Sequence, residues 1–96
     1  MNERDLYIIK LKAQLYDWQI HLDKLEAEMA GLSIGAKYEI NQHIALLESK
    51  IREGKLKLEE LAEATDQTWD AVKASVDESW KSITETFGEA YKEFMD

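Results

Sequence analysis

The chain has 96 residues, of which 45% are hydrophobic and 33% charged, with a net charge of −8, four glycines, no proline and no cysteine. The lack of cysteine excludes disulfides, thiolate zinc sites and cysteine nucleophiles, and the negative charge argues against a nucleic-acid partner. Because turns and loops normally use proline and glycine, these numbers predict a single, mostly helical coiled-coil domain over residues 1–96.

The first predicted helix begins near residue 3, where Asn2 is a suitable N-cap. Its apolar residues recur at steps of three and four, which is the spacing of one helix face: Ile8, Leu11, Leu15, Trp18, Leu22, Leu25, Met29 and Leu32. The apolar faces are wider than a two-stranded seam needs, because they also include Tyr7, Ile9, Tyr16, Ile20 and Leu46. Such wide faces favour contact with more than one partner helix.

The segment 31–35, Gly-Leu-Ser-Ile-Gly, allows two readings. Two glycines inside a helix cost about 2 kcal/mol relative to alanine, and Ser33 is able to cap a following helix, so the segment suits a turn. The apolar steps from Met29 to Ile40 nevertheless keep one face apolar, so a continuous helix also fits. The first reading predicts a three-helix bundle with helices at about 3–30, 36–64 and 67–95. The second predicts an antiparallel hairpin, in which a long helix over about 3–64 carries a returning helix over about 67–95.

A second interruption, at residues 64–68, ends the middle apolar stripe, and either Thr65 or Asp66 is placed to cap the last helix. That middle stripe contains Ile40, Ile44, Leu47, Ile51, Gly54, Leu58 and Leu61. Folding the last helix back near residue 65 places Gly54 opposite the stretch from Val76 to Trp80. The same fold places the basic stretch 50–57 opposite 74–81, which contains Asp77 and Glu78.

The last helix repeats its aromatic residues every eleven positions, with Trp69, Trp80 and Tyr91 in one column. Eleven residues make about three helical turns, so the repeat keeps one face aligned along the helix. Such a face suits either a packed seam or a lipid surface. From residue 68 onward the polar positions hold seven acids against three lysines, which anionic headgroups would repel, so the packed seam is favoured.

We therefore predict that packing and interaction depend on apolar residues of the first and last helices. They are Trp18, Leu22, Leu25, Trp69, Val72, Val76, Trp80, Ile83, Phe87, Tyr91 and Phe94.

Catalytic and metal-binding patterns are not found in the sequence. His21 follows Asp17 by four positions and His43 follows Glu39 by four, which is typical of surface pairs on a helix. The Glu-x-x-His motif of di-iron bundles is missing, because Trp18 and Ile40 stand three residues before the histidines. We expect no catalytic, cofactor-binding or metal-binding residues.

Three segments resemble a family of small bacterial coiled-coil proteins of the hypothetical or stress-response type. They are YIIKLKAQLYDWQIHLDKLEAE, YEINQHIALLESKIREGKLKLEEL and ATDQTWDAVKASVDESWKSI. The resemblance implies a helical, self-associating protein abundant under stress, with a helix that continues through residues 31–35. The resemblance therefore favours the hairpin, although Gly31 and Gly35 depart from the continuous helix that the family has at this position. It implies no catalytic or binding residues.

The functional expectation is a non-enzymatic structural or interaction protein, a self-associating coiled coil linked to stress response. Its partner would be a second copy of itself or another protein. The start of the sequence lacks the apolar stretch of a secretory signal, and no run reaches the length of a membrane span, so we expect a cytoplasmic location. The alternative is reversible binding of the 68–96 helix to a membrane surface.

Overall fold

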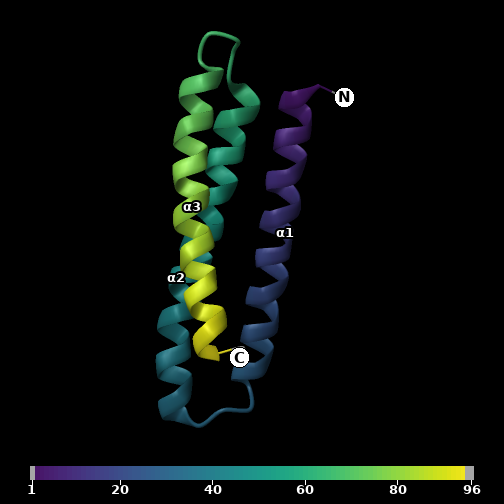
Figure 1. Ribbon diagram of the computed structural model, residues 1–96. Helices are drawn as coiled ribbons and strands as arrows, with labels where there is room; N and C mark the ends of the chain where they lie inside the picture. The colour runs from purple at the N-terminus through teal and green to yellow at the C-terminus, as the bar shows by residue number, and fades with distance from the viewer. Residues whose placement is uncertain (1, 95–96) are drawn as a thin grey trace.

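The computed structural model describes residues 2–94, with side chains up to Lys92, and within that range it contains three helices (Figure 1). They are α1 (Glu3–Met29), α2 (Ile34–Glu63) and α3 (Trp69–Phe94), with 27, 30 and 26 residues. The helices lie side by side with α2 antiparallel to the other two, in a rod 52 Å long (Figure 1). The predicted all-α class is confirmed, in the form of the three-helix bundle.

The continuous helix over about 3–64 is wrong, because the chain turns between α1 and α2. The last backbone N–H groups after α1 bond to carbonyls three residues back, as in Gly31 N–H to Glu28 C=O (3.3 Å) and Leu32 N–H to Met29 C=O (3.1 Å). Ser33 then caps α2, since its Oγ accepts from the Ala36 N–H at 3.4 Å. A tightened helix end followed directly by a new cap satisfies the free backbone groups, and Leu32 packs against the core to close the turn.

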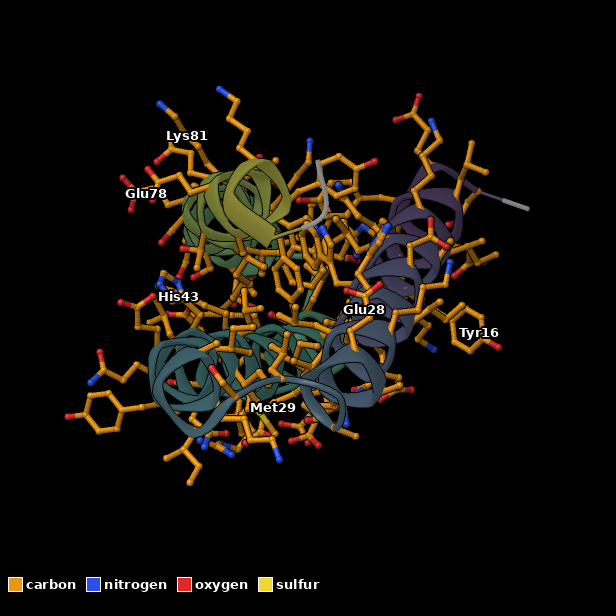
Figure 2. All side chains as sticks on the ribbon, turned by 90° about the horizontal axis from the view of Figure 1, so that it is seen from below. Tyr16, Glu28, Met29, His43, Glu78 and Lys81 are labelled. Carbon is orange, nitrogen blue, oxygen red and sulfur yellow. The ribbon has the colours of Figure 1, made fainter. Side chains whose placement is uncertain are left out.

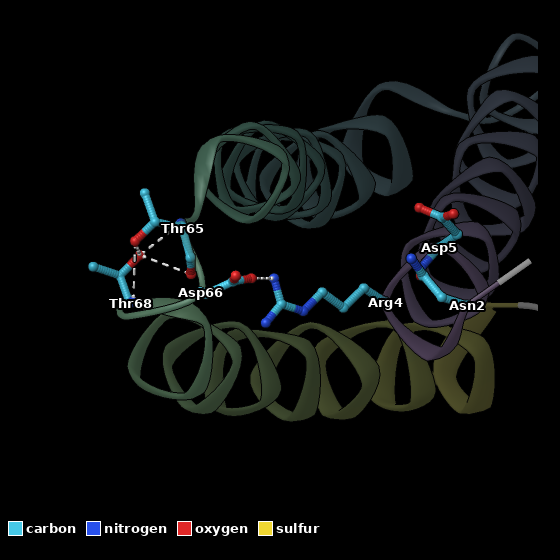
Figure 3. Close-up of polar contacts among 6 residues, drawn as sticks. All are labelled: Asn2, Arg4, Asp5, Thr65, Asp66 and Thr68. Carbon is cyan, nitrogen blue, oxygen red and sulfur yellow. Dashed lines mark hydrogen bonds and ion pairs between the residues drawn. The ribbon is translucent and has the colours of Figure 1, made fainter.

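In the connection between α2 and α3, two threonines form reciprocal hydrogen bonds (Figure 3). The Thr65 N–H donates to Thr68 Oγ1 at 2.9 Å, and the Thr68 N–H donates to Thr65 Oγ1 at 3.3 Å. This is the geometry of a capping box with a threonine in the place of the usual acid. Of the two predicted caps, Thr65 is therefore the one used, while Asp66 accepts a hydrogen bond from Arg4 instead (2.6 Å).

The core is a continuous column of apolar side chains from all three helices. The inner stripe of α1, as we call it below, supplies Leu11, Leu15, Trp18, Leu22 and Leu25. The other two helices supply Ile40, Ile44, Leu47, Ile51, Leu58, Leu61, Val76, Trp80, Ile83, Phe87 and Ala90. No polar or charged residue is buried among the described side chains. Burial of this column is therefore the main stabilising contribution.

The register between α2 and α3 matches the predicted fold-back near residue 65. A Cβ added to Gly54 would lie 3.4 Å from Cη2 of Trp80, so the indole fills the space left by the missing side chain. The expected charge pairing does not occur, because the lysines at positions 50 and 57 donate to Ser82 Oγ (3.0 Å) and Ser75 Oγ (2.9 Å). Those two lysines form ion pairs with acids of their own helix, Lys50 with Glu53 and Lys57 with Glu60.

The three helices do not pack equally. The backbone of α2 runs close to both other helices, whereas α1 and α3 have little direct backbone contact. Figure 1 shows α1 set apart from α3 near its N-terminal end. The space between these two parallel helices is filled by large side chains.

Candidate interaction surfaces

Aromatic rings join α1 to α3 along their shared edge. Tyr7 meets Trp69 edge-on with ring centroids 6.1 Å apart, and Trp18 lies 5.7 Å from Trp80. Trp18 also stacks on Phe87, with centroids at 5.4 Å and planes within 13°. Stacked and edge-on rings add stabilisation beyond the area they bury. The eleven-residue aromatic repeat of α3 thus packs against α1. The rings lie between the two helices and keep their backbones apart.

The N-terminal end of this edge is polar. The Arg4 guanidinium lies 4.8 Å above the Trp69 ring and forms an ion pair with Asp66, while the Lys73 ammonium lies 5.1 Å from the Tyr7 ring. The Tyr7 hydroxyl donates to the Asp77 carboxylate. Burial of the ring raises the pKa of Tyr7, and the hydrogen bond to the carboxylate and its charge raise it further. The tyrosine is therefore a neutral donor that positions α1, and it is unsuited to acid–base chemistry near pH 7.

The C-terminal end of the same edge is an open apolar groove of about 420 Å³. Trp18, Leu25 and Phe87 form much of its wall, and the Cβ position of Gly88 meets no other atom within 4 Å. The His21 ring meets Tyr91 edge-on at 6.1 Å at its margin. Few polar groups line the groove, so it lacks the converging polar side chains of a catalytic cleft.

Most of the predicted packing residues lie in the core or against it. Seven are buried: Trp18, Leu22, Leu25, Val76, Trp80, Ile83 and Phe87. Trp69 and Val72 are partly buried and pack on the core. Tyr91 is 51% exposed at the margin of the groove, and the side chain of Phe94 lies outside the described residues.

A second apolar stripe runs along the opposite side of α1 and faces away from the bundle. We call it the outer stripe; its residues follow steps of three and four: Leu6, Ile9, Ala13, Tyr16 and Ile20. Its four large side chains are 37% to 68% exposed. In Figure 2, Tyr16 points away from the other two helices. A helix that is apolar on two opposite sides has one more face than this fold covers.

Other exposed apolar residues are scattered on α2, where Ile34, Tyr38, Leu46 and Leu56 face outward. Only Ile34 and Tyr38 among these four are spaced by four positions, and the others are eight and ten positions apart, so the four form no continuous seam. The outward face of α3 is charged, and Figure 2 shows Glu78 and Lys81 pointing away from the bundle. The outer stripe of α1 is therefore the most regular apolar surface that the fold leaves uncovered.

The histidines lie on different helices, His21 on α1 and His43 on α2. Among the described residues no group of three or more histidines and acids is arranged to hold a metal ion. Within residues 2–94 we also find no helix with an apolar stretch sufficient to cross a membrane.

Sequence reasoning missed two features that the spacing contains. Tyr7 and Trp18 are eleven residues apart, as are their partners Trp69 and Trp80, so a shared repeat marks the α1–α3 edge. In the sequence, the outer stripe resembles a widening of the inner one. The three-and-four spacing of the outer stripe from Leu6 onward is the signal that distinguishes it from the inner stripe.

No protein-family model, curated protein or solved structure matches this chain significantly. The resemblance to bacterial coiled-coil proteins thus stays a prediction from the sequence.

Proposed function

We propose that this protein is a non-enzymatic structural or interaction protein that self-associates through the outer stripe of α1. The observation that carries the proposal is the exposed run of Leu6, Ile9, Ala13, Tyr16 and Ile20 along one straight side of a helix. Exposed apolar surface in a regular stripe is typical of helices that pack on a partner. The cytoplasmic location and the lack of enzymatic and nucleic-acid-binding activity belong to the same proposal, and its link to stress response depends on the resemblance alone.

The surface available for self-association in the bundle differs from the one that the predicted hairpin would expose. In the hairpin, the stripe from Ile8 to Met29 would need a second chain to cover it. In the bundle, α2 and α3 cover the buried part of that stripe. In the bundle, the exposed apolar surface of α1 is therefore the outer stripe, and it is no longer the stripe from Ile8 to Met29.

Reversible lipid binding by the last helix ranks below self-association. The face that would insert into lipid contains Val76, Trp80, Ile83 and Phe87, all of them buried in the core. Lipid binding would require α3 to leave the bundle, which exposes the whole core, whereas self-association uses a surface that is already exposed.

Sedimentation velocity over a concentration series tests the proposal, with Tyr16→Lys as the disrupting variant. We expect the wild type to form a weak dimer with a dissociation constant of about 10–100 μM, because short interfaces are transient. A lysine in the centre of the stripe should leave a monomer, since it places two charges in an apolar contact.

Leu56→Lys is the matched control, because Leu56 is similarly exposed (61% against 68% for Tyr16) but lies on α2 outside the stripe. It should leave the dimer intact. A wild type that remains monomeric at about 1 mM, well above the expected dissociation constant, would contradict the proposal. Loss of the dimer in Leu56→Lys would show that the association uses another surface.

A further inference from the structure

The charges on both sides of the outer stripe specify how two copies would pair. In heptad terms, Leu6, Ala13 and Ile20 occupy a positions, and Ile9 and Tyr16 occupy d positions. The residues beside an a/d seam are the g and e positions, which set partner choice and orientation in coiled coils. Here the g positions are Asp5 and Lys12, and the e positions are Lys10 and Asp17.

All four of these charged side chains are exposed. In the described part of the chain, none of the four forms an ion pair with its own chain. Their charges are therefore free to meet a partner. They also alternate in sign along each side of the stripe, a pattern that complements itself only in particular alignments.

We propose that the outer stripe pairs with the same stripe of a second copy in a parallel, in-register arrangement, so that Asp5 meets Lys10 and Lys12 meets Asp17 across the interface. In parallel pairs a g residue lies next to the e residue five positions later in the partner helix. Both g/e pairs then join opposite charges, and the two-fold symmetry makes four such contacts. The inference rests on the proposed function, because it assumes that the outer stripe is where the copies meet.

An antiparallel arrangement centred on residue 12 is less favourable for the same stripe. Antiparallel pairs bring g next to g and e next to e, so in that register Lys12 approaches Lys12 of the other copy. The like charges oppose that alignment, whereas the parallel one has no like-charge contact between Leu6 and Ile20. The stripe ends at Asp23, the next d position, where the two parallel helices must diverge to keep two carboxylates apart.

Charge-reversal variants at one g/e pair test the orientation. Lys12→Glu and Asp17→Lys should each weaken the dimer about five- to tenfold, since each replaces two attractive contacts with two repulsive ones. The double variant should bind within about twofold of the wild type, because both pairs are restored with inverted sign. Residues five apart do not face each other on one helix, so the double variant creates no pair between positions 12 and 17 of its own chain.

Sedimentation velocity measures the dissociation constants, and thermal unfolding followed by circular dichroism confirms that each variant is folded. A wild-type dimer that the double variant fails to restore overturns the parallel pairing and leaves self-association standing. A wild type without any dimer overturns both proposals. The two failures are therefore distinguishable.

A spin label provides an independent readout, because the chain contains no cysteine to compete for it. Lys24→Cys places one label just beyond the stripe. In the parallel dimer the two labels lie at the same end, within about 20 Å of each other, whereas antiparallel pairing separates them by about 30 Å along the helices at 1.5 Å per residue. The longer distance would overturn the proposal.

Discussion

Leu22 and Tyr16 lie on the same helix, less than two turns apart, yet the first is 2% exposed and the second 68%. Both belong to apolar stripes with the same three-and-four spacing, one on each side of α1. The inner stripe is flanked by residues that also pack, such as Tyr7 against Trp69. The outer stripe is flanked by charges, such as Lys12 and Asp17. The flanking residues thus differ between the face that is covered within the chain and the face that the bundle leaves uncovered.

The sharpest way to test this comparison is to truncate one residue of each stripe. Leu22→Ala should lower the free energy of unfolding by about 3 kcal/mol, since it leaves a cavity in a closely packed core. Tyr16→Ala should change the free energy of unfolding of the dilute monomer by less than about 0.5 kcal/mol, because the ring loses little contact. Urea unfolding followed by circular dichroism at low micromolar concentration measures both. Similar losses in the two variants would mean that the outer stripe is also covered within the chain.

A second test enlarges a residue beneath the inner stripe. A Cβ added to Gly54 would lie 3.0 Å from Cδ1 of Leu15 and 3.4 Å from Cη2 of Trp80. Gly54→Leu should therefore lower the free energy of unfolding by about 2 kcal/mol through overpacking.

Gly88→Ala is the control for this variant, since an added Cβ there meets nothing within 4 Å. It should raise the free energy of unfolding by about 0.5–1 kcal/mol, because alanine loses less conformational entropy in a helix than glycine does. Thermal and urea unfolding measure both variants. A stabilising Gly54→Leu would mean that α1 is not held against this position.

Much of the fold follows from the sequence, because helices of this kind are specified locally. Asn2, Ser33 and Thr65 are capping residues by type, and each accepts the backbone hydrogen bond expected of it. The fold-back near residue 65 predicts Gly54 opposite the stretch from Val76 to Trp80, and a Cβ added to Gly54 would lie 3.4 Å from Cη2 of Trp80.

The turn at residues 30–33 and the outer stripe were harder to predict, for different physical reasons. The apolar steps through Leu32 fit a turn and a continuous helix equally, so apolar spacing alone does not decide between them. The outer stripe has the spacing of a core, and spacing does not reveal which face a small bundle leaves uncovered. The expected pairing of the lysines at positions 50 and 57 with α3 acids failed because both side chains bond to serines instead.

The smallest effect is expected at the edge between the two faces of α1, where Glu26 approaches Glu48 of α2. Burial raises the pKa of Glu26, and the hydrogen bond to Glu48 and the charges of Glu48 and Asp23 raise it further. Folded protein therefore holds this proton more tightly than unfolded protein does. The resulting stabilisation is full below the ordinary pKa of a glutamate and is lost as the pH rises through the raised value.

Glu26→Gln should consequently stabilise the fold at pH 7 and have no benefit near pH 3.5. Because the group is largely exposed, solvent and salt screen the repulsion, and we expect a gain of only about 0.3 kcal/mol. Urea midpoints at the two pH values measure it, and added salt should reduce the gain at pH 7. Glu28→Gln is the control, since Glu28 lies on the same turn and is exposed. Equal gains in both variants would mean that the stabilisation comes from lowering the total negative charge of −8. The contact between Glu26 and Glu48 would then not be its cause.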